Sequence, residues 1–364
     1  MRLLLVLLAL YGVPSLAADG DPTPSMPGSV YVPPRLVAKQ NLPNLYPGFP
    51  DREALVYVSF LVGTDGRASS LTINEGGFYN KRFSDAALQF VSRVRFVPAM
   101  RDGVPVAVSE VMPVRFSVEG NRGVTAEFRS EMAKVVRLAQ DKDYVGAHFH
   151  AQWMLAEKVQ LNYEYAVLNY TIADTQARMG NVHRALIASR AATGRVSMDM
   201  EKYEPGGPIP LRRESDFTLS KGVLEAALRQ RFALAASQGF FLEALRTHAD
   251  LQGLGIIRKD DPTMATFEKV LSHVQTSPTL VANVQIDEDA YWDHDPLFSR
   301  LVVVGVKGGT LEGLELRCAS QIQMFKIQDS VELSIPENAR GCRGRFIGTP
   351  GTRFKLIELR DLPG

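Results

Sequence analysis

The chain has few of the residues that usually build reactive or metal-binding centres. Its 364 residues include two cysteines, two tryptophans and six histidines. His148 and His150 stand two positions apart in a predicted helix, so they do not share a face and are poorly spaced for one metal ion. The sequence has no Gly-x-Ser-x-Gly elbow, and neither cysteine has a catalytic context. We therefore expect no enzyme, no metal site and no cofactor.

An excess of charge of either sign is also lacking. Lysine and arginine number 41 against 40 aspartates and glutamates, a formal net charge of +1. Proteins that bind nucleic acid through its phosphates usually carry a basic excess, so nucleic acid is not an expected partner. With 45% apolar and 22% charged residues the composition is that of a folded protein. The length favours two or three domains.

Long apolar runs are absent except at the N-terminus. The stretch from Leu3 to Val13 follows one arginine and precedes Pro14 and a small-residue pattern ending at Ala17. This is the layout of a secretory signal peptide, and the run falls short of the roughly 20 residues that a membrane span needs. We predict a signal peptide over residues 1–17, cleaved near Ala17 or Ala18. An uncleaved membrane anchor is the alternative.

Three differently patterned blocks follow a proline-rich segment over residues 18–34, which is typical of an extended linker. In residues 35–120, "ALVYVSFLVGTDG" and "RASSLTINEGG" alternate as two strands of a hairpin. Ser84 is placed to cap a helix with Asp85 in its first turn, and an alternating run from Val106 to Val118 predicts a third strand. The unit is strand, strand, helix, strand.

Residues 121–275 are expected to form helical hairpins. Ala147, Ala185 and Ala244 each lie a few positions into a predicted helix, and the last two follow closely on Gly180 and Gly239. A helix, a short turn and a helix with an early alanine are typical of tetratricopeptide-like hairpins, because small residues let paired helices approach closely. The alanines are unevenly spaced, so the repeats are degenerate.

Residues 276–364 carry short strand patterns around Gly308-Gly309 and Pro350-Gly351, where the first pair predicts a hairpin turn. Cys318 and Cys342 both fall in this block. In an exported chain such a pair tends to form a disulfide, worth roughly 3 kcal/mol. The stretch "DEDAYWDHD" lacks the glycine that a calcium loop requires, so we predict a solvated acidic loop.

The block over residues 35–120 resembles the C-terminal domain of TonB proteins, the periplasmic end of transducers that couple inner-membrane proton flow to outer-membrane transporters. Each short match is weak alone, and their order and spacing carry the resemblance. The matching stretches are "LYP" at residues 45–47, the first strand with its Asp65-Gly66 turn, "FSDAAL" at 83–88, "VRFVPA" at 94–99 and "GVPV" at 103–106.

The resemblance implies a sheet edge that accepts an extended peptide by strand addition. The last strand would be that edge, and Pro113 within it suits an edge strand because proline donates no ladder hydrogen bond. Glu110 breaks the apolar face of this strand. The residues expected to form the partner-binding strand are Val108, Glu110, Met112, Val114 and Phe116.

The sequence therefore predicts a multi-domain α+β protein. It has a TonB C-terminal-like ββαβ domain, an α-helical repeat-like middle and a small disulfide-tied β domain. We expect an exported, periplasmic protein that acts through contacts with envelope proteins, outer-membrane transporters among the candidates. The alternative is a TonB-type energy transducer for outer-membrane transport, held in the inner membrane by an uncleaved anchor and facing the periplasm.

Overall fold

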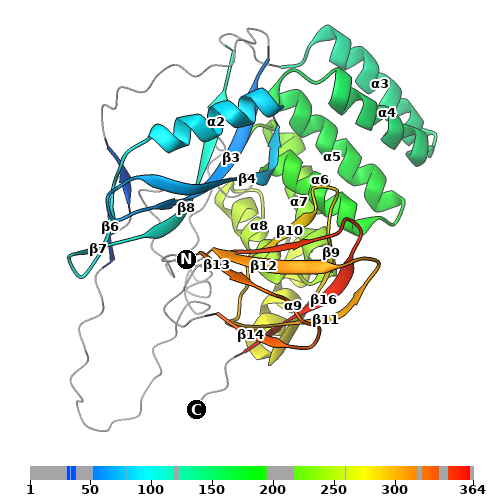
Figure 1. Cartoon of the computed structure of the whole chain (residues 1–364). Helices are drawn as coiled ribbons and strands as arrows, with labels where there is room; N and C mark the ends of the chain where they lie inside the picture. Colours follow the sequence, from blue (N-terminus) through cyan, green and yellow to red (C-terminus); the bar gives the residue numbers. More distant parts are fainter. Residues whose placement is uncertain are drawn as a thin grey trace.

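The computed structural model describes most of the chain from Tyr31 to Arg360 (Figure 1). The predicted signal peptide, most of the predicted linker and both cysteines lie outside the described residues. Within the described part, no helix is both long and apolar enough to cross a membrane. The described ranges are residues 31–32, 34–37, 52–78, 80–118, 123–194, 217–258, 260–317, 322–335 and 343–360.

The N-terminal module has the predicted order of strand, strand, helix, strand. Strands β3 (Ala54–Val62), β4 (Ala68–Phe78) and β8 (Val108–Phe116) form an antiparallel sheet in the order β4-β3-β8. Helix α2 (Lys81–Arg93) covers one face of this sheet (Figure 1). The core between the sheet and α2 is apolar because every second residue of β3 is apolar and faces inward, as the alternating sequence predicted. These residues are Ala54, Val56, Val58, Phe60 and Val62.

Helix α2 begins one turn earlier than predicted. Its N-cap is Asn80, whose Oδ1 accepts hydrogen bonds from the backbone N–H groups of Arg82 and Phe83 at 3.0 and 3.2 Å. Ser84 instead donates its hydroxyl to the carbonyl oxygen of Lys81. The prediction of Ser84 as the cap was wrong because asparagine is an equally good cap and here precedes it.

Short strands surround the join between α2 and β8. They are β5 (Phe96–Val97), β6 (Ala99–Arg101) and β7 (Val104–Val106). The third strand was predicted to begin at Val106, but Val106 ends β7, and β8 begins at Val108. Between β6 and β7 the chain turns at Asp102-Gly103, where both φ angles are positive, at 52° and 79°. This is the backbone that two-residue hairpin turns favour.

The end of the predicted linker is part of the fold. Strand β1 (Tyr31–Val32) pairs with β6, and β2 (Arg35–Leu36) pairs with β5. Pro34 between them is buried. The prediction of a poorly packed linker reaching residue 34 is therefore wrong at its C-terminal end, since strand pairing was not visible in a proline-rich composition.

Seven helices follow the module in the described residues, and six of them form three hairpins. In each hairpin the second helix carries the predicted alanine at its fourth position, and Ala147, Ala185 and Ala244 are all fully buried. The close approach that the alanines predicted is therefore present. The helices are α3 (Ala126–Gln140), α4 (Tyr144–Glu157), α5 (Asn162–Arg178), α6 (Val182–Thr193), α7 (Lys221–Gln238), α8 (Phe241–Gly253) and α9 (Pro262–Thr276).

The C-terminal strands form two antiparallel four-stranded sheets, in the orders β10-β15-β12-β13 and β14-β11-β16-β9. Consecutive strands β11 and β12, and again β15 and β16, belong to different sheets. The hairpin predicted around Gly308-Gly309 was therefore wrong, because this turn carries the chain between sheets. The strands are β9 (Thr279–Gln285), β10 (Tyr291–His294), β11 (Arg300–Lys307), β12 (Leu311–Arg317), β13 (Ile322–Phe325), β14 (Glu332–Ser334), β15 (Arg343–Gly348) and β16 (Arg353–Leu359).

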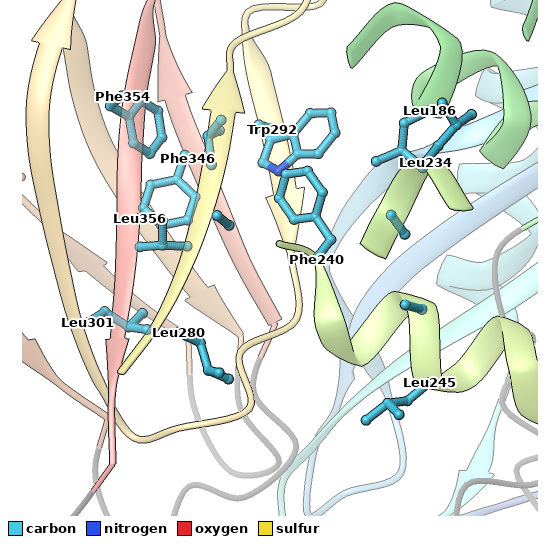
Figure 2. Packing of buried hydrophobic residues seen from close by; sticks show 14 of the residues in the cluster. Leu186, Leu234, Phe240, Leu245, Leu280, Trp292, Leu301, Phe346, Phe354 and Leu356 are labelled. Carbon is cyan, nitrogen blue, oxygen red and sulfur yellow. The ribbon is translucent and has the colours of Figure 1, made fainter. Parts of the chain in front are cut away.

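One apolar core joins the helices to the two sheets. Figure 2 shows Phe240 at the start of α8 against Trp292 of β10, with ring centroids 5.1 Å apart. The turn between α7 and α8 reaches this core through Gly239, which has a φ of 83° and lies so close to β9 that a Cβ would meet the carbonyl oxygen of Val281 at 1.9 Å. Only glycine fits there, so the helical region and the β region pack as one body.

The register of the C-terminal sheet bears on the predicted disulfide. Arg317 and Arg343 are directly paired on β12 and β15. Cys318 and Cys342 are the next residues along each chain and lie outside the described residues. The disulfide therefore stays a prediction.

Candidate protein-binding edge

Strand β8 forms an outer edge of the three-stranded sheet. It pairs with β3 over its whole length, from Val62 opposite Val108 to Ala54 opposite Phe116, without a register shift. Within the described residues no strand pairs with its other side. An edge strand of nine residues presents unpaired backbone N–H and C=O groups, and these can form a ladder with an extended peptide.

At the opposite edge, arginines of the C-terminal sheet that contains β12 and β15 bind backbone carbonyls of β4. Arg317 donates from Nη1 to the carbonyl oxygen of Ser70 at 3.0 Å. Arg345 donates to the carbonyl oxygen of Ile73 at 3.3 Å and to Oδ1 of Asn74 at 3.0 Å. These guanidinium groups occupy acceptors that an added strand would need. Of the two edges, β8 is the one left for strand addition.

The face of the sheet opposite α2 is also covered. Tyr57, Ser59 and Asn74 on this face are buried, and Asn74 donates to the Ser59 hydroxyl at 2.6 Å. Glu53 accepts a hydrogen bond from the backbone N–H of Asn162 at the start of α5, at 3.0 Å. The module is therefore held against the helices and the C-terminal sheets through polar contacts.

The side chains expected to contact a partner mostly face the module core. Val108, Val114 and Phe116 are buried, and Met112 packs against the same cluster. The Phe116 ring lies 5.1 Å from that of Phe83 on α2. These four side chains position the strand, so recognition along β8 would use the main chain together with the outward-facing side chains. Exposed examples are Pro113 and Arg115.

Glu110 is the unusual member of the strand. It is 3% exposed, lies opposite Phe60 of β3, and its Oε2 has no hydrogen-bond partner within the described residues. Burial raises the pKa of Glu110 from 4.5 to about 8, because the apolar core disfavours the charged form. A neutral carboxylic acid therefore sits in the middle of the edge strand at neutral pH.

A buried charge network lies where the helices meet the C-terminal sheets. Arg345 pairs with Asp293 at 2.8 Å, and its guanidinium lies 4.0 Å from the Tyr291 ring centroid. The Glu243 carboxylate accepts from Arg190 and Arg231 at 2.6 and 2.9 Å. These arginines hold the pKa of Glu243 at about 2, even though burial opposes ionisation. The sequence reasoning missed this network, because its members are far apart along the chain.

The acidic stretch before β11 differs from its prediction. Asp293 and His294 belong to β10 and are 2% and 6% exposed, with His294 Nε2 2.9 Å from Glu358 Oε1. Asp295 pairs with Arg343 at 2.9 Å and with Arg246. Within this stretch only Glu288 and Asp289 are exposed. The prediction of one solvated loop was therefore wrong, since arginines from other elements neutralise these carboxylates.

The histidines considered as metal ligands have other partners. His150 Nε2 lies 2.9 Å from Glu131, and the ring nitrogens of His148 lie 3.0 Å from the Gln176 amide. Among the residues with described positions, no group of three or more His, Cys, Asp or Glu side chains could hold a metal ion.

Comparison with known proteins agrees with the geometry of the module. Residues 51–118 match the protein family described as Gram-negative bacterial TonB protein C-terminal. The match spans β3, β4, α2 and β8, so the resemblance inferred from short motifs is confirmed for this module. No curated protein and no solved structure was found to match the chain. The tetratricopeptide-like character of the helices remains an interpretation of their hairpin pattern.

Proposed function

We propose that this protein is an exported, periplasmic protein-binding protein that receives an extended segment of an envelope protein along β8. The observation that carries the proposal is the contrast between the two edges of the module: Arg317 and Arg345 cover β4, whereas β8 has no strand on its outer side in the described residues. The match to the TonB C-terminal family supports an envelope partner, outer-membrane transporters among the candidates. No catalytic step forms part of this proposal.

The contacts of the module give it a fixed orientation. Polar bonds from Glu53 to α5, and from Arg345 to Asn74, tie the sheet to the rest of the chain. A rigidly presented edge loses less conformational entropy on binding than a tethered, freely moving one. The helices and C-terminal sheets thus serve as the scaffold that presents β8.

Site-specific photo-crosslinking in the native cell tests the proposal. A photoreactive amino acid replaces Arg115, which is exposed on β8, and in a matched strain it replaces Val145, which is 56% exposed on α4. We expect a discrete crosslinked envelope protein at position 115 that is absent at position 145. An extended peptide from that protein should then slow hydrogen exchange of the β8 amides. Equal crosslinking at both positions, or protection confined to other strands, would contradict the proposal.

A truncation would be a poor substitute for this experiment. Deleting residues 35–120 removes the module atoms that accept from Arg317 and Arg345 and exposes the polar surface on which the module rests. Loss of a partner could then follow from misfolding alone.

A TonB-type energy transducer is the second candidate, and the same family match favours it. Transduction requires attachment to the inner membrane, so the N-terminus of the native protein decides between the two. Mass spectrometry of that N-terminus should show a chain beginning near Ala18 or Asp19 if the protein is released into the periplasm. An intact Met1 with membrane retention would favour the transducer.

A further inference from the structure

A second candidate site lies in a cleft between the N-terminal end of α6 and the sheet that contains β9, β11 and β16. The cleft has two halves with volumes of about 530 and 540 Å³. His183, Gln238, Gln285 and Arg353 line both halves, so the two are continuous. None of these residues belongs to the TonB C-terminal-like module.

The cleft carries positive charge without the matching carboxylates. Arg184, Lys307, Arg353 and Lys355 line it, and no aspartate or glutamate is among the described lining residues. The described carboxylates form no ion pair with Lys307, Arg353 or Lys355. A cleft of one charge sign attracts ligands of the other sign, because its low-dielectric walls focus the field.

The strand register makes this charge costly in the unliganded protein. Lys307 of β11 is directly opposite Arg353 of β16, and Lys355 is two residues farther along β16. Like charges directly opposite in an antiparallel pair destabilise the sheet. A bound carboxylate between Lys307 and Arg353 would replace this repulsion with two favourable ion pairs.

The end of α6 adds a second anion-attracting element. Its N-cap, Asn181, makes no side-chain hydrogen bond to the first turn, and its Nδ2 donates to Gln176 Oε1 at 2.8 Å. The first N–H groups of a helix and its dipole favour negative charge when no cap occupies them. Arg184, in this first turn, has one ion pair, with Glu288 at 3.4 Å, and the Glu288 side chain is 89% exposed. Such an exposed pair contributes little and is readily exchanged.

The remaining lining residues narrow the class of ligand. Asn283, Gln238 and Gln285 supply amides that both donate and accept hydrogen bonds, as a peptide main chain requires. The aromatic residue in the described lining is Phe354, which is 4% exposed and packs inward against Phe346. Single-stranded nucleic acid binds by stacking its bases on exposed aromatic rings, and sugar rings are commonly held in the same way. The lining offers no such platform.

We propose that this cleft binds an acidic peptide segment of a partner protein. One carboxylate lies between Lys307 and Arg353, a second approaches the N-terminal end of α6, and the amides of Gln238 and Gln285 bond the peptide main chain. This site is separate from the β8 edge, so the scaffold would hold a partner at a second surface.

Fluorescence anisotropy with the full mature chain tests this site. The ligand is a short fluorescein-labelled peptide in which glutamate alternates with serine, and the reference peptide has glutamine in place of every glutamate. Arg353→Gln should weaken binding of the glutamate peptide about three- to fivefold, because Arg353 is exposed and an exposed ion pair contributes modestly to affinity. Lys269→Gln removes the same charge from an exposed position of α9 and should leave binding unchanged.

A second measurement separates the site from general electrostatics. Lys307→Gln should weaken peptide binding and also raise the thermal midpoint of the free protein, because it relieves the repulsion with Arg353. Equal losses from Arg353→Gln and Lys269→Gln would overturn the proposal, as would equal binding of the glutamine peptide. Tighter binding of a carboxylated polysaccharide such as polygalacturonate would also overturn it, because the ligand would then be a glycan.

Discussion

Replacing Glu110 with glutamine should remove a large pH dependence of stability. The folded protein holds the Glu110 proton up to a pKa of about 8, whereas the unfolded chain loses it near 4.5. The contribution of protonated Glu110 to the free energy of unfolding is therefore fully present below about pH 4.5 and is lost as pH rises through 8. At about 1.4 kcal/mol for each pH unit, the total loss approaches 5 kcal/mol. A protonated glutamate and a glutamine have nearly the same shape, so the variant should match the native protein in acid.

Urea unfolding followed by far-ultraviolet circular dichroism measures this effect. Both proteins are unfolded at pH 5 and at pH 9, and the difference in unfolding free energy between them is compared. We expect this difference to change by about 4 kcal/mol in favour of Glu110→Gln. Tryptophan fluorescence is less suitable, because Trp153 and Trp292 lie in α4 and β10, outside the module.

Other titrating groups cancel in this comparison. Burial lowers the pKa of His183 to about 3 and that of His248 to about 4, so both histidines make the native protein more stable as pH rises toward 6.5. The variant keeps both. If the two proteins show the same change between pH 5 and pH 9, Glu110 is not protonated in the folded state and the reasoning from its burial is wrong.

Three further predictions concern the scaffold. Arg345→Met leaves the buried Asp293 carboxylate without its ion pair and should cost about 3–5 kcal/mol in urea unfolding, with part of the loss regained when Asp293→Leu is added. His248 stacks 3.7 Å from the Phe267 ring, and neither of its ring nitrogens has a partner in the described residues. His248→Phe should therefore abolish about 3 kcal/mol of pH dependence between pH 4 and 6.5, measured by the same unfolding series. Thiol labelling of the unmutated protein, denatured without reductant, should find no reactive cysteine. Cys342→Ser should lower the free energy of unfolding by roughly 3 kcal/mol. Full labelling of both thiols would exclude the disulfide.

The module was predictable because its signals are local. The alternation of Val56, Val58 and Phe60 fixes which face of β3 is buried, and the motifs around α2 have a spacing that the family match confirms. The start of α2 was misplaced because Asn80 and Ser84 are both good caps, and only packing decides which residue is used. The burial of the three alanines was expected because each is a small residue early in the second helix of a predicted hairpin.

The pairing of the C-terminal strands was not predictable from local pattern. A glycine pair between two strands is compatible with a hairpin and with a crossing between sheets, and the sequence around Gly308-Gly309 does not distinguish them. The shared core decides between these two arrangements. Phe240 packs against Trp292 of β10, and residues from both sheets belong to the same apolar core (Figure 2). The same packing buries Asp293, which looked like a loop carboxylate.

The sequence by itself determined the order of strand, strand, helix and strand in the N-terminal module, because periodicity and short motifs act between neighbouring residues. It also predicts export, from the layout of the N-terminal segment, and an accepting edge at the last strand, which the resemblance to the TonB C-terminal family implies. Only the tertiary structure decided which edge is open. Arg317 and Arg345 lie more than 200 positions from the β4 carbonyl groups that they cover. The tertiary structure likewise placed Lys307 opposite Arg353 in one cleft, because strand pairing depends on contacts across the whole chain.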